Sequence, residues 1–283
     1  MSNLNEIKRR IGVVKNTAKI TKAMQLTSAL KMKKMQGAVS KSHIYLETLQ
    51  EVLGNVRESL DGQYALMKHP KTRKNALVVI VGNNRGFVGS QISKLTVAVY
   101  GLVEELKLEG INITVMTVKK KSLGIVKRLG LKSTYHFQES YEQFNPAETA
   151  PLKEIIVNGF IEGKYDEVYI TYTRFESTFI QTPITLKLLP IEAKITSDSN
   201  SKYKFEPDSD QIINYLLGEY IDFEIFNIFL NASASEYSAR MIAMQKATDN
   251  AIDLSDRLTL KYNKDRQALI TQQIQENVNV NLT

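Results

Sequence analysis

The sequence lacks cysteine altogether, and its six prolines all lie between Pro70 and Pro207. Without cysteine, the 283-residue chain has no disulfide, no thiolate nucleophile and no cysteine-ligated metal. Proline is the strongest helix breaker. Its absence from both ends leaves each end free to form one very long helix, and 60 helical residues would span roughly 90 Å.

Long apolar runs are also missing. The longest strongly apolar run is Ala76 to Val81, far below the ~20 residues that a membrane-spanning helix needs. Residues 1–10 are polar and charged and lack the apolar stretch of a secretory signal. We therefore expect a cytosolic protein, with enough apolar residues, 43%, to form a sizeable core.

Acidic residues are scarce near the start of the chain. Residues 1–42 contain ten Lys or Arg and one acid, Glu6, so this segment carries +9 and the remainder −2. A helix this basic is attracted to acidic surfaces, such as nucleic acid, anionic lipid or an acidic protein partner. The alternative is a solvated helix face without a partner.

The N-terminal segment has apolar residues spaced alternately by three and four, which is a heptad seam. The seam consists of Leu4, Ile7, Ile11, Val14, Ala18, Thr21, Gln25, Ser28, Met32, Met35, Val39, Ser42, Leu46, Leu49, Leu53, Val56 and Leu60. Its polar members cluster between Thr21 and Ser28, where we expect looser packing. Met24, Leu26 and Leu30 lie off the seam, and they indicate either a contact with another protein or an adjustment of the packing.

The C-terminal segment, from about residue 209 to 277, is also predicted to be helical. Alanines recur every four residues from Ala239 to Ala251, followed by Leu254 and Leu258. Such a ridge lets another helix approach closely. The two terminal helices would most economically pair as an antiparallel coiled coil, although periodicity leaves pairing between chains open.

Between the helices, strand and helix patterns alternate. We expect strands at 76–81, 111–118, 166–173 and 178–189, and helices at 91–108, 123–129 and 151–160. This alternation predicts a Rossmann-like α/β domain with a mostly parallel sheet. The fold class is thus α/β plus a long antiparallel coiled coil, with domains at 1–69, 70–207 and 208–283.

No catalytic or cofactor motif is evident in this domain. Gly82, Gly86 and Gly89 follow the first strand, but their spacing fits neither a dinucleotide fingerprint nor a P-loop. The three histidines lack metal-ligand spacing, and no nucleophile elbow or His-Glu-x-x-His helix occurs. We therefore expect a protein that is not an enzyme and has no cofactor or metal.

The order of motifs at both ends is highly specific, and over essentially its whole length the chain resembles the gamma subunits of F-type ATP synthases. The N-terminal motifs are Ile7-Lys8-Arg9-Arg10-Ile11, Val14-Lys15-Asn16-Thr17 and Lys19-Ile20-Thr21-Lys22-Ala23-Met24. The C-terminal motifs are Ala234-Ser235-Glu236, Ala239-Arg240-Met241, Ala243-Met244, Ala247-Thr248-Asp249-Asn250-Ala251, Leu258, Tyr262-Asn263-Lys264, Arg266-Gln267-Ala268 and Ile270-Thr271.

The resemblance implies a rotor shaft, the central stalk of a rotary motor that couples ATP synthesis or hydrolysis to hydrogen ion transport. Its two terminal helices would lie inside a hexamer of alpha and beta subunits, which carry out the catalysis. Epsilon and the c-ring would attach at the base. The protein would then be cytoplasmic and peripheral at the cytoplasmic face of the cell membrane, which it would meet only indirectly.

The resemblance also implies contacts with the beta subunits. Met24 matches the position where the shaft meets an acidic beta segment, and Lys22 is a candidate charge partner. Arg266, Gln267 and Thr271 match residues that engage a beta-subunit loop near the upper shaft. These are coupling contacts, not catalytic groups.

Two alternatives remain open at this point. One is the shaft of an F1-like ATPase paralogue that drives machinery other than a proton ring, because residues 83–90, Tyr237, Gln273 and 276–281 depart from the family pattern. The other is a basic coiled-coil adaptor that binds nucleic acid through residues 8–41. This segment has no aromatic residue on which bases could stack, and we expect no nucleic-acid partner.

Overall fold

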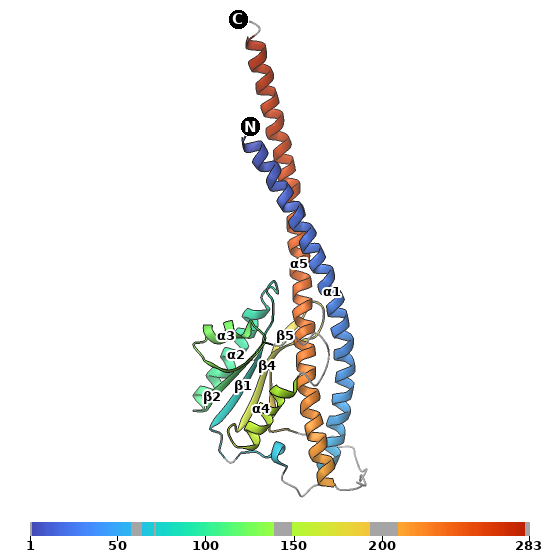
Figure 1. Cartoon of the computed structure of the whole chain (residues 1–283), viewed down its shortest axis with the longest axis vertical. Helices are drawn as coiled ribbons and strands as arrows, with labels where there is room; N and C mark the ends of the chain where they lie inside the picture. Colours follow the sequence, from blue (N-terminus) through green and yellow to red (C-terminus); the bar gives the residue numbers. More distant parts are fainter. Residues whose placement is uncertain (1, 58–63, 71, 139–148, 193–208, 281–283) are drawn as a thin grey trace. The chain divides into compact units, whose positions relative to one another are not determined.

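The computed structural model describes residues 2–57, 64–70, 72–138, 149–192 and 209–280. Along the sequence, an α/β segment lies between two very long helices (Figure 1). The elements are α1 (Ser2–Arg57), the 3₁₀ helix η1 (Ala65–Met67), β1 (Asn75–Val81), α2 (Gln91–Leu108), β2 (Asn112–Val118), α3 (Ser122–Arg128), β3 (Ser133–Phe137), α4 (Ala150–Ile161), β4 (Glu167–Phe175), β5 (Gln181–Leu189) and α5 (Ser209–Val280).

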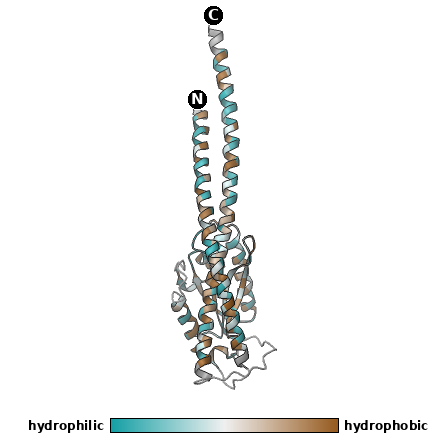
Figure 2. Ribbon diagram, turned by 90° about the vertical axis from the view of Figure 1, so that its right-hand side faces the viewer, coloured by the Kyte–Doolittle hydropathy of each residue, from teal (hydrophilic) through white to brown (hydrophobic). Residues whose placement is uncertain are grey.

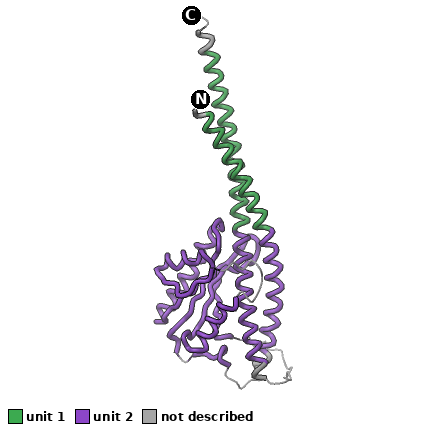
Figure 3. The backbone as a smooth tube through the Cα atoms, viewed as in Figure 1, with its two compact units in different colours: residues 1–29, 240–283 green, residues 30–239 purple. Residues whose placement is uncertain are grey.

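The chain divides into two compact units (Figure 3). Unit 1 comprises Met1–Ala29 and Arg240–Thr283, and unit 2 comprises Leu30–Ala239. The helices α1 and α5 therefore contribute one segment to each unit. The predicted division into 1–69, 70–207 and 208–283 stays a prediction, and its boundary at residues 207 and 208 lies outside the described residues.

The sheet of unit 2 has the strand order β3-β2-β1-β4-β5. All neighbours are parallel except β4 and β5, which form an antiparallel pair at one edge. The mostly parallel sheet predicted from the sequence is thus confirmed. The sequence analysis missed β3, the shortest strand.

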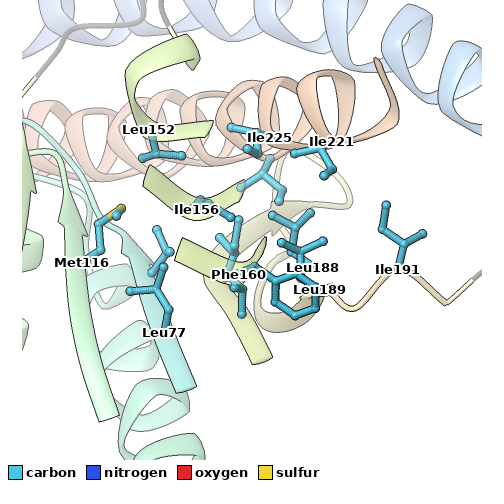
Figure 4. Close-up of a cluster of buried hydrophobic side chains, with 14 of the residues drawn as sticks. Leu77, Met116, Leu152, Ile156, Phe160, Leu188, Leu189, Ile191, Ile221 and Ile225 are labelled. Carbon is cyan, nitrogen blue, oxygen red and sulfur yellow. The ribbon is translucent and has the colours of Figure 1, made fainter. Parts of the chain in front are cut away.

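Successive side chains of a strand point to opposite faces of the sheet, and here apolar side chains of helices cover both faces. Ala76, Val78 and Ile80 of β1 pack with residues of α2 and α3 in one apolar cluster. Leu77 and Val79 pack on the other face, against α4 and α5. Figure 4 shows this second cluster, in which Leu152, Ile156 and Phe160 of α4 approach Ile221 and Ile225 of α5.

Within unit 2, α1 and α5 run antiparallel and are joined mainly by apolar contacts. Met35 of α1 packs with Leu230 and Ala234 of α5. Further along α1, the ring centroid of Tyr45 lies 4.1 Å from that of Phe223. Residue numbers rise along α1 while those of its contacts fall along α5, which confirms an antiparallel pair within one chain.

Candidate partner-contact surface

The seam of α1 in unit 1 follows the heptad pattern read from the sequence. Its members are all buried or half-buried: Leu4, Ile7, Ile11, Val14, Ala18, Thr21, Gln25 and Ser28. Figure 2 shows the corresponding alternation of hydrophilic and hydrophobic residues around the helices of this unit. Thr21 and Ser28, at the two ends of the polar stretch, are both buried, so this stretch remains part of the seam.

The facing seam of α5 is built from small side chains and one methionine. Met244, Thr248, Ala251 and Ser255 are buried, again at spacings of three and four. Of the predicted ridge, Ala251 is buried and Ala243 and Ala247 are half-buried. Leu254, expected to continue the ridge, is exposed instead.

A pair of hydroxyl groups joins the two helices of unit 1. The side-chain oxygens of Thr21 and Thr248 lie 2.7 Å apart in a buried hydrogen bond. Thr248 is also within 2.8 Å of the carbonyl oxygen of Met244, one turn earlier in its own helix. Because a hydrogen bond depends on direction, this pair defines the register of α1 against α5.

Lys22 and Met24 lie beside this hydroxyl pair on α1. Lys22 is exposed, and its Nζ donates a hydrogen bond of 3.2 Å to Oε1 of Gln25. Met24 is half-buried, so part of its thioether side chain is accessible. Near them, Ile20 is 61% exposed and Leu26 is 56% exposed. This part of α1 therefore presents apolar and positively charged groups together.

Arg266, Gln267 and Thr271 lie on a different part of α5. All three are exposed. Thr271 donates a hydrogen bond of 2.9 Å from its hydroxyl to the backbone oxygen of Gln267, so its polar hydrogen is used within the helix. The nearby Ile270 and Ile274 are also exposed.

The structure does not bring these two groups of residues together. Lys22 and Met24 lie next to Thr21, whose partner on α5 is Thr248. Arg266 follows Thr248 by 18 residues on the same helix, which corresponds to roughly 27 Å along its axis. Unit 1 thus has two separate candidate contact zones.

The structure adds a charge asymmetry that the sequence analysis missed. The basic residues Lys8, Arg9, Arg10, Lys15, Lys19 and Lys22 are all exposed on α1. On α5, Asp249, Asp253 and Asp256 are exposed at spacings of four and three, and the exposed Lys246 and Arg257 lie beside them on the same face. This face of α5 therefore has mixed charge, in contrast to the basic face of α1.

The glycine turn after β1 is occupied by internal contacts. A Cβ atom on Gly82 would lie 2.8 Å from the backbone nitrogen of Ser122, so the turn packs closely against the start of α3. Asn83 donates from Nδ2 to Oε1 of Gln91 at 2.8 Å in a buried hydrogen bond. Across the described residues, no group of three or more His, Cys, Asp or Glu side chains could hold a metal ion. None of the described helices is both long enough and apolar enough to cross a membrane.

Comparison with known proteins gives consistent matches over the whole chain. A family model described as ATP synthase matches residues 3–279. The ATP synthase gamma chain of Chloroflexus aurantiacus is 35% identical over 286 residues, covering 98% of this chain and 97% of that protein. The gamma chain of Geotalea daltonii is 33% identical, covering 98% and 96%.

Solved structures share the fold. A chain in the Euglena gracilis mitochondrial ATP synthase, determined with OSCP, F1 and the c-ring, superposes with a TM-score of 0.69. The two sequences are 20% identical, and the match covers 99% of this chain and 93% of that one. A chain of the Tetrahymena thermophila central stalk and c-ring gives a TM-score of 0.57 at 23% identity, covering 81% and 99%.

Proposed function

The chain belongs to the family of ATP synthase gamma chains, and we propose how it works as the central-stalk rotor of an F-type ATP synthase. The observation that carries the proposal is the antiparallel pair formed by α1 and α5 in unit 1. A pair of helices with a closed internal seam presents its outer surface to other proteins. We propose that this surface turns inside a hexamer of alpha and beta subunits.

The rotor itself performs no chemistry in this proposal, and ATP is made or hydrolysed on the beta subunits. Two observations support this division. The turn after β1 lacks the glycine spacing of known nucleotide sites, and Gly82 in it packs directly against Ser122. The exposed groups proposed to matter are instead on α1 and α5.

Coupling follows from the different sides of unit 1. The α1 surface is basic, whereas the exposed face of α5 has mixed charge, with Asp249, Asp253 and Asp256 beside Lys246 and Arg257. Such a shaft cannot make equal contacts with three equivalent beta subunits at once. Each angle of the shaft favours a different set of nucleotide states, and only this difference in contact free energy links rotation to catalysis.

Specific contacts are proposed for the two zones described above. Lys22 and Met24 would contact an acidic segment of a beta subunit, with Lys22 supplying the opposite charge. Arg266, Gln267 and Thr271 would contact a beta-subunit loop. Their exposure supports both proposals, since none of the five side chains is fully buried.

The remaining partners and the location follow from the family. We propose that epsilon and the c-ring bind the chain, so that the protein is held at the cytoplasmic face of the cell membrane without entering it.

Purification of the native complex tests the function. A tagged chain is expected to copurify with alpha and beta subunits in an assembly that hydrolyses ATP, and with epsilon and c subunits. Alpha and beta without c subunits would instead favour an F1-like ATPase paralogue. Recovery of a free chain bound to RNA, with affinity falling steeply with salt, would overturn the proposal.

A further inference from the structure

The α5 helix fills a position that other α/β proteins use for ligands. In an open, mostly parallel sheet, ligands bind outside the carboxyl ends of the strands, where the strand order reverses. Here that point lies at β1, with β2 on one side and β4 on the other. Residues 231–238 of α5 contact the carboxyl ends of both flanking strands.

One side of α5 is bonded to the end of β4 and to the turn that follows it. Asn231 accepts a hydrogen bond of 3.3 Å at Oδ1 from the backbone nitrogen of Phe175. Ser235 donates from its hydroxyl to the carbonyl oxygen of Thr173 at 3.0 Å. One turn further, the hydroxyl of Ser238 donates to the carbonyl oxygen of Thr178. These three residues are spaced by four and three, which places them on one stripe of the helix.

A second stripe of α5 meets Lys119, the first residue after β2. Its Nζ lies 3.1 Å from the hydroxyl oxygen of Ser233 and 3.4 Å from Oε2 of Glu236. Both charged groups are nearly inaccessible, with side-chain exposures of 3% for Lys119 and 7% for Glu236. The next residues, Lys120 and Lys121, are exposed. Of three consecutive lysines, only the one facing α5 is buried.

The backbone holds Lys119 in this inward position at a cost. Its φ angle is 68°, in the left-handed region that non-glycine residues seldom adopt. Its backbone nitrogen donates to the carbonyl oxygen of Phe137 at 2.8 Å, and the hydroxyl of Ser122 donates to the carbonyl oxygen of Val118 at 2.8 Å. A strained residue persists where its surroundings fix it and where its position serves a function.

We propose that the α/β domain uses its ligand crevice to grip α5, and that the Lys119–Glu236 pair is a latch that fixes the rotation of α5 about its own axis. The carboxylate of Glu236 takes the place that an anionic ligand would occupy in a binding protein of this fold. The apolar contacts of Ile221 and Ile225 hold α5 on the sheet, but they have little directionality. The ion pair and its hydrogen bonds supply the direction.

The effect of the ion pair on the orientation of α5 can be measured separately from its effect on folding stability, because a buried ion pair contributes little net stability. Replacing such a pair by apolar residues of similar size is often neutral, whereas removing one partner leaves a buried charge and is strongly destabilising. Lys119→Met tests the loss of one partner, and Lys119→Met with Glu236→Met removes both charges. Lys120→Met, at the adjacent exposed lysine, is the matched control.

Amide hydrogen exchange on the full chain tests whether Lys119 holds this part of α5 in place. Lys119→Met should accelerate exchange at residues 233–238 by about 100-fold, because it removes the ammonium group that faces the buried carboxylate of Glu236. The double variant should return these amides to within about tenfold of the unmodified chain. Lys120→Met should leave them unchanged. Equal exchange in Lys119→Met and Lys120→Met would overturn the proposal.

The claim that the ion pair fixes the rotation of α5 rests on the proposed rotor function. It is tested by measuring the angle of the α/β domain in the assembled complex. The chain has no cysteine, and Leu108 is an exposed residue of the α/β domain. Leu108→Cys therefore provides a single site at which a bead can be attached to this domain. With the hexamer fixed and ATP absent, the double variant should give a wider angular distribution than Lys120→Met. Equal widths would show that apolar packing alone fixes α5. If no hexamer assembles, the rotor function fails, and exchange on the free chain still decides whether the latch exists.

Discussion

The same two helices are joined in different ways in the two units. In unit 2, α1 and α5 bury large apolar side chains, including Leu46 and Leu49 of α1 and Ile221, Ile225 and Ile228 of α5. In unit 1, the buried seam contains Thr21, Ser28, Thr248, Ala251 and Ser255. Burial of apolar area stabilises in proportion to that area, so the free energy of unfolding resides mainly in unit 2. The small and polar side chains of unit 1 fix the register of its two helices more than they stabilise their pairing. Contacts with surrounding subunits would add to the stability of this pair.

The largest expected effect compares isoleucines of the two units. Ile221→Ala in unit 2 should lower the free energy of unfolding by about 2–5 kcal/mol, because the side chain is fully buried in the main apolar cluster. Ile7→Ala in unit 1 should have a much smaller effect on the same transition. Urea denaturation of the full chain measures both. Equal losses would contradict the assignment of stability to unit 2.

A buried acid in unit 2 offers a stabilising change. Burial raises the pKa of Glu224 to about 7, and this carboxyl group lies near the phenols of Tyr172 and Tyr220. The folded chain therefore binds a proton that the unfolded chain releases, and stability falls as the pH rises from about 4.5 to about 7. Glu224→Gln should remove this dependence and raise stability at pH 8 by about 3 kcal/mol. Denaturation at pH 5 and pH 8 tests it, and a constant difference between variant and unmodified chain at both pH values would contradict the prediction.

A smaller effect is expected for the hydroxyl pair of unit 1. Thr21→Val should weaken the local pairing by about 1 kcal/mol, because a buried hydrogen bond is lost while the shape is retained. Thr248→Val and the double variant complete a cycle that isolates the pair. Hydrogen exchange at residues 14–28 is the measurement, since global denaturation reports on unit 2. Additive single effects would show that the two hydroxyls do not interact.

The smallest effect on stability is expected at the end of α5. Arg266→Ala with Gln267→Ala should leave the unfolding free energy within about 0.5 kcal/mol, because both side chains are exposed. The assembled complex should nevertheless show lower rotation-coupled ATP turnover. The pair Lys261→Ala and Lys264→Ala, also at exposed positions of α5, is a matched control. Unchanged turnover in the Arg266 and Gln267 variant would remove these residues from the contact zone.

Part of this difference between the two units could be read from the sequence. The seam of α1 was predictable because each member repeats at heptad spacing over many turns. The alanine ridge of α5 was only partly right. Leu254 follows Ala251 by three residues, which turns it roughly 60° away from Ala251 around the helix, and it lies outside the seam that contains Ala251 and Ser255.

Other features depend on contacts that no local pattern encodes. The strand β3 has five residues, lies at the sheet edge and includes a serine and a histidine, so its apolar signal is weak. The buried pair of Lys119 and Glu236 joins residues 117 positions apart. In the sequence, Lys119 is simply the first of three lysines, and only tertiary packing distinguishes it from its neighbours.

The antiparallel strand β5 has a further consequence for the fate of newly made chains. It is an edge strand of the sheet, and it contains Pro183 and Lys187. Proline offers no backbone donor to an incoming strand, and lysine at an edge disfavours aggregation. At the opposite edge, β3 is too short to template a long intermolecular ladder. A gamma chain waiting for its partner subunits is therefore protected from polymerising with other copies through its sheet.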